Sequence, residues 1–172
     1  SITRSNTHWK KKVPMAQLRQ LLSDNGFSNV QTWIQSGNVI LDSMLSHKEV
    51  GEKVNRIIKE GIGADLKIIV KTPAQVKTII AENPFTEGHD ISRVFFALSN
   101  DLPEQSLLAA FQALDFGEDK FAISPHAIYL FVPESFAKTR LNNNFLERKL
   151  KIDVTIRNFN TLSKLMSLCD NT

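Results

Sequence analysis

The sequence predicts an α+β protein made of two tandem ferredoxin-like halves, each with a βαββαβ order and an extra helix after it. A strand-turn-helix phrase occurs twice, as KIIVKTPAQVKTII from Lys67 and as DVTIRNFNTLSKLM from Asp153. A hairpin phrase precedes each copy, as QSGNVIL from Gln35 and as SPHAIYL from Ser124. Repetition of one supersecondary unit in the same order indicates an internal duplication.

The first half is expected to cover residues 1–85. Its expected elements are a helix from Pro14 to Asn25, strands over 30–34 and 39–41, a helix from Ser46 to Gly61, a strand over 66–70 and a helix over 72–82. Proline suits the first turn of the first helix. Ser46 with Glu49 has capping-box spacing, and Gly61 is expected to stop the second helix.

The βαββαβ order also needs an opening strand, and the first half shows none. Residues 1–12 have no usable apolar period. In this topology the opening strand is central, so its absence leaves backbone groups unpaired in the middle of the sheet. We therefore expect the first half to lack its opening strand in this chain, with a strand before Ser1 or another segment filling the gap.

The second half is expected to cover residues 86–172, after a polar loop at 83–90. Its expected elements are a strand over 93–98, a helix from Pro103, strands over 120–123 and 127–131, a helix containing Phe145, a strand over 153–157 and a final helix. With right-handed crossovers this order leaves few arrangements besides the ferredoxin-like one.

Composition excludes several classes of protein. Of 172 residues, 42% are hydrophobic and 23% charged, which is ordinary for a soluble domain. The apolar runs are far shorter than the roughly 20 residues of a membrane helix, so no membrane partner is expected. Cys169 is the single cysteine, which predicts a reducing, cytoplasmic location.

The charge is basic and unevenly placed. The isoelectric point is near 9.0, which suits a polyanionic partner. One basic stretch lies near the start of the chain, and a second contains Lys138, Arg140, Arg148, Lys149, Lys151 and Arg157. The alternative is an ordinary solvated surface with local excesses of charge.

Two segments resemble a known family. They are VPMAQLRQLLSDNGFSNVQTWIQSGNVILDS, residues 13–43, and AKTRLNNNFLERKLKIDVTIRNFNTLSKL, residues 137–165. Both are similar to the uncharacterised bacterial family called domain of unknown function sixteen-ninety-seven. The resemblance implies two ferredoxin-like halves and no established activity.

No metal, cofactor or catalytic motif is predicted. His8, His47, His89 and His126 lie on different expected elements without ligand spacing, and Cys169 alone cannot complete a zinc set. The phrases of serine hydrolases, P-loops and dinucleotide-binding folds are missing. Whether the protein is an enzyme stays open.

Three places are predicted to bind a ligand. The first is the hairpin turn with Ser36 and Asn38, whose N–H groups suit an anion, where the alternative is a plain hairpin turn. The second is Lys138 with Arg140 just before a helix, where the alternative is loop solubility. The third is Arg157 with Asn158 at the end of the last strand, where Asn158 or Asn160 is expected to cap the next helix.

These residues support three hypotheses. The first is a binding module for nucleic acid or a phosphate-bearing ligand. The second is a small-molecule enzyme acting at the cleft between the halves, with Ser36, Asn38, Lys138 and Arg157 converging on an anionic group. The third is a protein-interaction or dimerisation domain, including a homo-oligomer.

Overall fold

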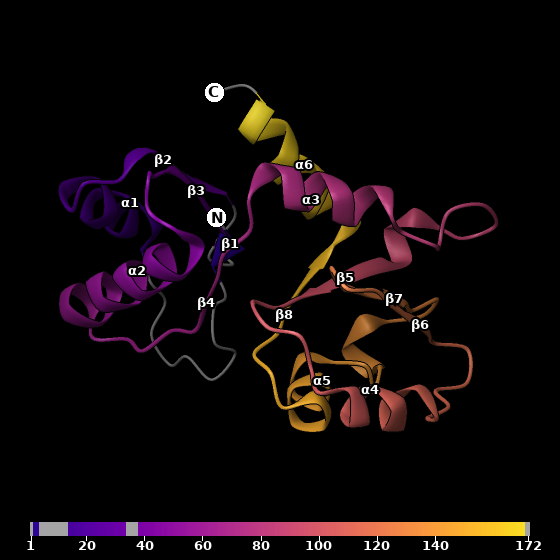
Figure 1. The fold of residues 1–172 in the computed structure, drawn as a ribbon. Helices are drawn as coiled ribbons and strands as arrows, with labels where there is room; N and C mark the ends of the chain where they lie inside the picture. Colours follow the sequence, from indigo (N-terminus) through magenta and orange to yellow (C-terminus); the bar gives the residue numbers. More distant parts are fainter. Residues whose placement is uncertain (1, 4–13, 34–37, 171–172) are drawn as a thin grey trace. The chain divides into compact units, whose positions relative to one another are not determined.

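The computed structural model describes residues 2–3, 14–33 and 38–170 (Figure 1). The chain forms two compact units, the first from Ser1–Thr72 with Asn171–Thr172 and the second from Pro73–Asp170. The described residues contain six α-helices and two antiparallel sheets, which makes a mixed α/β fold. No described helix combines the length and apolar character that crossing a membrane requires.

The first unit has one four-stranded sheet in the order β2-β3-β1-β4. Its elements are β1 (Ile2–Thr3), α1 (Met15–Asp24), β2 (Ser28–Trp33), β3 (Asn38–Asp42), α2 (His47–Ile62) and β4 (Ile68–Ile69). The expectation of a missing opening strand is wrong. Ile2–Thr3 forms that strand, and Ile2 pairs with Asn38 of β3 and Ile69 of β4. The pairing with β3 and β4 places this strand, whereas the sequence pattern of residues 1–12 shows no apolar period.

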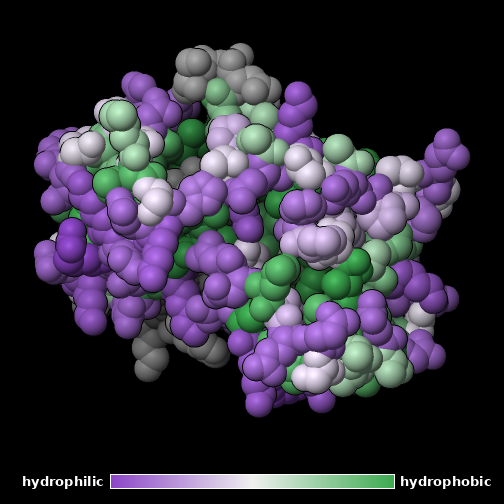
Figure 2. All heavy atoms as spheres, in the orientation of Figure 1, coloured by the Kyte–Doolittle hydropathy of each residue, from purple (hydrophilic) through white to green (hydrophobic). Residues whose placement is uncertain are grey.

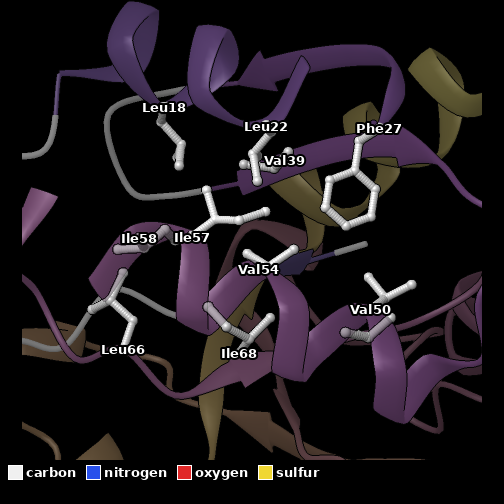
Figure 3. Packing of buried hydrophobic residues seen from close by; sticks show 11 residues of the cluster. Leu18, Leu22, Phe27, Val39, Val50, Val54, Ile57, Ile58, Leu66 and Ile68 are labelled. Carbon is white, nitrogen blue, oxygen red and sulfur yellow. The ribbon is translucent and has the colours of Figure 1, made fainter. Parts of the chain in front are cut away.

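Both helices of the first unit pack on one face of this sheet. Leu18 and Leu22 of α1 meet Val54 and Ile58 of α2 over Val39 of β3 (Figure 3). The helical residues recur every three or four positions, so each helix turns one apolar stripe to the strands. Their burial provides the core that holds the sheet and the helices together.

The second helix of this unit begins and ends at well-defined caps. Ser46 Oγ accepts a hydrogen bond from the Glu49 N–H at 3.3 Å, as the capping box predicts. The helix does not stop at Gly61. It continues to Ile62 and ends at Gly63, whose φ of 78° is left-handed. A Cβ on Gly61 would lie 2.9 Å from Leu21 Cδ1, so Gly61 allows close approach of α1 instead.

The second unit repeats the same strand order, as β6-β7-β5-β8. Its elements are α3 (Pro73–Ala81), the 3-10 turn η1 (Ile91–Arg93), β5 (Val94–Leu98), α4 (Gln105–Gln112), β6 (Lys120–Ile123), β7 (Ile128–Phe131), the 3-10 turn η2 (Phe136–Lys138), α5 (Asn143–Leu150), β8 (Thr155–Asn158) and α6 (Phe159–Asp170). The expected strands and helices of this unit all form, with ends shifted by a few residues.

Helices cover both faces of the second sheet (Figure 1). Helices α4 and α5 pack on the face that carries Ala97 and Leu130. Helices α3 and α6 lie side by side over the opposite face, where Phe96 contacts Phe159 of α6 and Tyr129 donates a hydrogen bond to the Ile79 carbonyl of α3 at 2.8 Å. In the space-filling view, apolar residues gather between these two helical layers (Figure 2).

The division between the units lies earlier than the boundary expected at residue 85. Helix α3 follows the last strand of the first sheet along the chain, but it belongs to the second unit. It buries Val76 and Ile79 and packs against α6. A polar loop therefore marks the end of α3, whereas the compact units divide at Thr72 and Pro73.

Candidate functional site

The residues of the predicted hairpin-turn site are placed only in part. Ser36 lies outside the described residues. Asn38 opens strand β3, pairs with Ile2 and Trp33, and is completely buried. A side chain with no exposed surface offers nothing to a ligand from solution. In this structure Asn38 acts as an interior residue of the sheet.

Lys138 and Arg140 lie on the side of the second sheet covered by α4 and α5. Lys138 ends η2 and is exposed, and Arg140 is exposed two residues later. The Arg140 guanidinium carbon lies 5.2 Å from the ring centroid of Phe116 and 5.8 Å from that of Phe145. Both rings belong to the apolar cluster beneath α4 and α5.

Arg157 faces the other side of the same sheet. It pairs with Phe96, and directly opposite residues of paired strands share one face. Arg157 Nη1 donates to Thr155 Oγ1 at 2.6 Å and to the Ile156 carbonyl at 2.9 Å. Burial lowers the pKa of Arg157 to about 10, because the charged form loses hydration. The structure therefore does not bring Arg157 together with Lys138 and Arg140.

Asn158 has the capping role that was one of its two expected roles. Its Oδ1 accepts a hydrogen bond from the Thr161 N–H at 2.7 Å, in the first turn of α6. An asparagine oxygen in this position satisfies one of the free N–H groups of a helix start. This contact explains Asn158 as a part of the fold.

The chain between η2 and α5 is fixed by four hydrogen bonds. Thr139 is buried, and its Oγ1 donates to Asp119 Oδ2 at 2.6 Å while accepting from the Leu141 N–H at 3.1 Å. Asn142 Oδ1 accepts from the Phe145 N–H at 2.9 Å, and its side-chain amide donates to the Thr139 carbonyl at 3.3 Å. Lys138 and Arg140 therefore extend from a backbone that is already ordered.

Two further cations join Arg140 around the Phe145 ring. The Arg148 guanidinium carbon lies 5.5 Å from the ring centroid, and Lys149 Nζ lies 5.8 Å from it. We call Arg140, Arg148 and Lys149 around Phe145 the cation cluster. The sequence prediction did not include Arg148 and Lys149 as ligand-binding residues. Their spacing of three and four residues from Phe145 on one helix was a usable signal, because such residues are neighbours on a helix surface.

The cation cluster places three positive charges around one ring. None of its three cations forms an ion pair with a described residue. All three charged groups lie within 5.8 Å of the centroid of the Phe145 ring. The C-terminal dipole of α5 favours Arg148 and Lys149 in its last turn, and each cation gains about 0.5–1 kcal/mol from the ring.

Acidic residues border the cluster on one side. Asp115, Glu118 and Asp119 lie in the turn that contains Phe116. Asp119 already accepts the Thr139 hydroxyl, and Asp115 Oδ1 accepts the Gly117 N–H at 2.8 Å. The cluster is thus open to an anion on the sides away from this turn.

A second polar group lies at the turn between β6 and β7. His126 Nε2 is 3.9 Å from Glu82 Oε1, and both side chains are exposed. Burial raises the pKa of the Tyr129 hydroxyl nearby. Among the described residues, no three His, Cys, Asp or Glu side chains are placed to hold a metal ion. The contact between His126 and Glu82 links the residue after α3 to the turn between β6 and β7.

Comparison with known proteins identifies the family and the fold. The solved structure of the conserved bacterial protein SP0830 from Streptococcus pneumoniae is similar, with a TM-score of 0.76 and 23% identity over 97% of this chain and 94% of that one. At this identity the likeness concerns the fold. No curated protein matches the chain. A family model described as "Protein of unknown function (DUF1697)" matches residues 6–129, which confirms the resemblance seen in residues 13–43. The chain therefore belongs to this family of unknown function.

Proposed function

We propose that this protein binds a phosphate-bearing polyanion through the cation cluster of the second unit. One observation supports this most directly: Arg140, Arg148 and Lys149 gather around one ring without an ion pair among the described residues. Three like charges on one surface attract an anion, and the attraction grows as the anion comes closer to them. Lys138 and Lys151 are exposed at the two ends of the same segment and extend the positive surface.

The geometry favours phosphate over a single carboxylate. Two of the three cations are guanidinium groups, whose forked donors match phosphate oxygens. A polyanion also carries condensed counterions, and their release on binding adds a favourable entropy. Contacts of this kind predict affinity that falls steeply as the salt concentration rises.

The test is a comparison of two triple variants that remove the same charge. Arg140→Gln/Arg148→Gln/Lys149→Gln removes the cluster, and Lys48→Gln/Lys59→Gln/Lys77→Gln removes three exposed lysines elsewhere. Binding of labelled inorganic polyphosphate is followed by fluorescence anisotropy over a series of salt concentrations. We expect the cluster variant to weaken binding about tenfold or more at low salt and to lower the salt slope by roughly 2. Equal loss in both variants would show diffuse attraction and no site.

The tandem ferredoxin-like architecture is also an inference. Both sheets have the order second-third-first-fourth strand, which is the order of a split βαβ unit. Helix α3 follows β4 in the chain as α6 follows β8, which supports a division of the duplicated sequence into residues 1–85 and 86–172 as a proposal. The cytoplasmic location, the enzyme acting between the halves and the dimerisation domain stay predictions.

A further inference from the structure

We propose that the polyanion is a single-stranded nucleic acid, whose bases use aromatic rings beside the cation cluster. This proposal rests on the proposed function and adds the class of ligand. Phosphate contacts alone do not distinguish a single strand from a duplex or from polyphosphate, because all three carry the same charged groups. Exposed aromatic faces do distinguish them, because only unpaired bases are free to stack on a side chain.

Phe136, one member of a stacked aromatic pair, lies close to Lys138 and Arg140 along the chain. Phe95 of β5 and Phe136 of η2 stack with centroids 4.3 Å apart and an interplanar angle of 30°. Both residues pack against the apolar cluster beneath α4 and α5 and are half-buried, unlike Phe96, which is fully buried on the opposite face. The ring of Phe136 is held in place by this stacking, so a base that packs on it meets a surface that is already ordered.

Cations and rings alternate along the segment that follows. Lys138 comes two residues after Phe136, and Arg140 comes four residues after it. Arg140 in turn lies over Phe116, a second partly exposed ring, and over Phe145. Surfaces that bind single strands combine cations that contact the backbone with rings that stack on bases. The segment from Phe136 to Lys149 provides both kinds of group.

The acidic turn indicates where the phosphates run. Glu118 is exposed in the turn that carries Phe116, where it would repel a phosphate. A bound single-stranded nucleic acid is therefore expected to place its phosphates along the line from Lys138 to Arg148 and Lys149, away from this turn. Glu118→Gln should strengthen binding of a single-stranded nucleic acid about twofold to threefold, because it removes one negative charge near the path of the phosphates.

The experiment uses three probes on the full chain. They are a labelled single-stranded oligonucleotide without self-complementarity, the duplex of the same sequence, and inorganic polyphosphate. Phe136→Leu keeps an apolar side chain and removes the stacking face. Phe159→Leu is the matched control, because Phe159 is also partly exposed but packs toward Phe96 on the opposite face. Thermal unfolding of both variants checks that they remain folded.

We expect the oligonucleotide to bind more tightly than the duplex. Phe136→Leu should weaken the oligonucleotide about tenfold and leave polyphosphate unchanged, since a stacked base contributes about 1–3 kcal/mol. Phe159→Leu should leave both unchanged. Equal affinity for the three probes, with no effect of Phe136→Leu, would overturn the single-strand proposal while the polyanion site stands. Failure of every probe to depend on the cation cluster would overturn both.

Discussion

The two units share one strand order and differ in how much structure supports it. In the described residues of the first unit, the central strand is β1 at Ile2–Thr3, and the second helix, α2, has 16 residues. The second unit has a central strand of five residues, β5, and a second helix of eight, α5. Helices cover both faces of the second sheet within its own unit. The same strand order therefore accommodates a second helix that is twice as long in the first unit as in the second.

Helices α2 and α5, which lie between the third and fourth strands of each unit along the chain, show where the units differ chemically. Both begin at a side-chain cap, Ser46 for α2 and Asn142 for α5, and both end at a residue with left-handed backbone. That last residue is Gly63 in the first unit and Lys151 in the second. The second unit thus places a cation where glycine is the easier choice, at the end of the surface that carries the cation cluster.

The largest expected effect comes from the aromatic core beneath that surface. Phe111 is buried and contacts the rings of Phe116, Phe121 and Phe145. Phe111→Ala should lower the free energy of unfolding by about 3–5 kcal/mol, through lost burial and a cavity. Hydrogen exchange followed by mass spectrometry should show lost protection in β5 to β8.

Ile58→Ala is the counterpart in the first unit, since Ile58 is fully buried on α2. This substitution should lower the free energy of unfolding by about 2–5 kcal/mol and remove protection from hydrogen exchange mainly in β2 and β3. If either variant exposed the amides of both units to the same extent, the units would unfold as one cooperative body. The two units could then not be compared as independently stable parts of the chain.

A buried hydroxyl distinguishes the two hairpins. The hairpin repeat aligns Tyr129 with Ile40, so only the second unit carries a hydroxyl at this position. Tyr129 donates to the Ile79 carbonyl, which receives no bond from the Asn83 N–H because that group donates to Ile80. Tyr129→Phe leaves this helix-end carbonyl without its donor and should cost about 1–3 kcal/mol in denaturant unfolding.

The same tyrosine makes stability depend on pH. Burial raises its pKa above the ordinary 10.0, so the folded state favours the neutral hydroxyl. The stability from this group is complete below pH 10.0 and is lost as the pH rises through the raised value. The wild-type protein should therefore lose more stability above that pH than Tyr129→Phe, in parallel unfolding series. Identical pH profiles would contradict a tyrosine that is protected in the fold.

Much of the fold follows from the sequence because its helices are amphipathic and its strands are bounded by turns. The strand expected at 120–123 is β6, and the Ser46 cap forms as its spacing indicates. The opening strand at Ile2–Thr3 could not be predicted, because residues 1–12 show no apolar period and the pairing with β3 and β4 defines its place.

The candidate site was predictable only in part. The basic stretch contained the members of the cation cluster, but it also contained Arg157. The face on which Arg157 lies depends on its register with Phe96, and a shift of one residue would reverse it. Helix spacing around Phe145, by contrast, is visible in the sequence and would have identified Arg148 and Lys149.

The helix caps allow a closer comparison of α2 with α5. Asn142 Oδ1 accepts from the Phe145 N–H at 2.9 Å, whereas Ser46 Oγ accepts from the Glu49 N–H at 3.3 Å. Asn142→Ala should therefore cost about 1 kcal/mol and Ser46→Ala about half as much, measured by chemical denaturation. The reverse order would mean that distance does not rank these caps. Asn142→Ala should also loosen the start of α5 beside Arg140 and weaken polyanion binding.

The smallest expected effects come from the residues that end these helices. Gly63 has φ 78° and open space around its Cα, so Gly63→Ala should cost about 1 kcal/mol through backbone conformation alone. Lys151 has φ 55°, and Lys151→Gly should stabilise the protein by up to about 1 kcal/mol for the opposite reason. If Lys151 contacts a phosphate, the same variant should lower the salt slope of polyanion binding by about 0.7 to 0.9. A more stable variant that binds less well would show that this lysine is retained for binding. Unchanged binding would limit the surface to the cation cluster and Lys138.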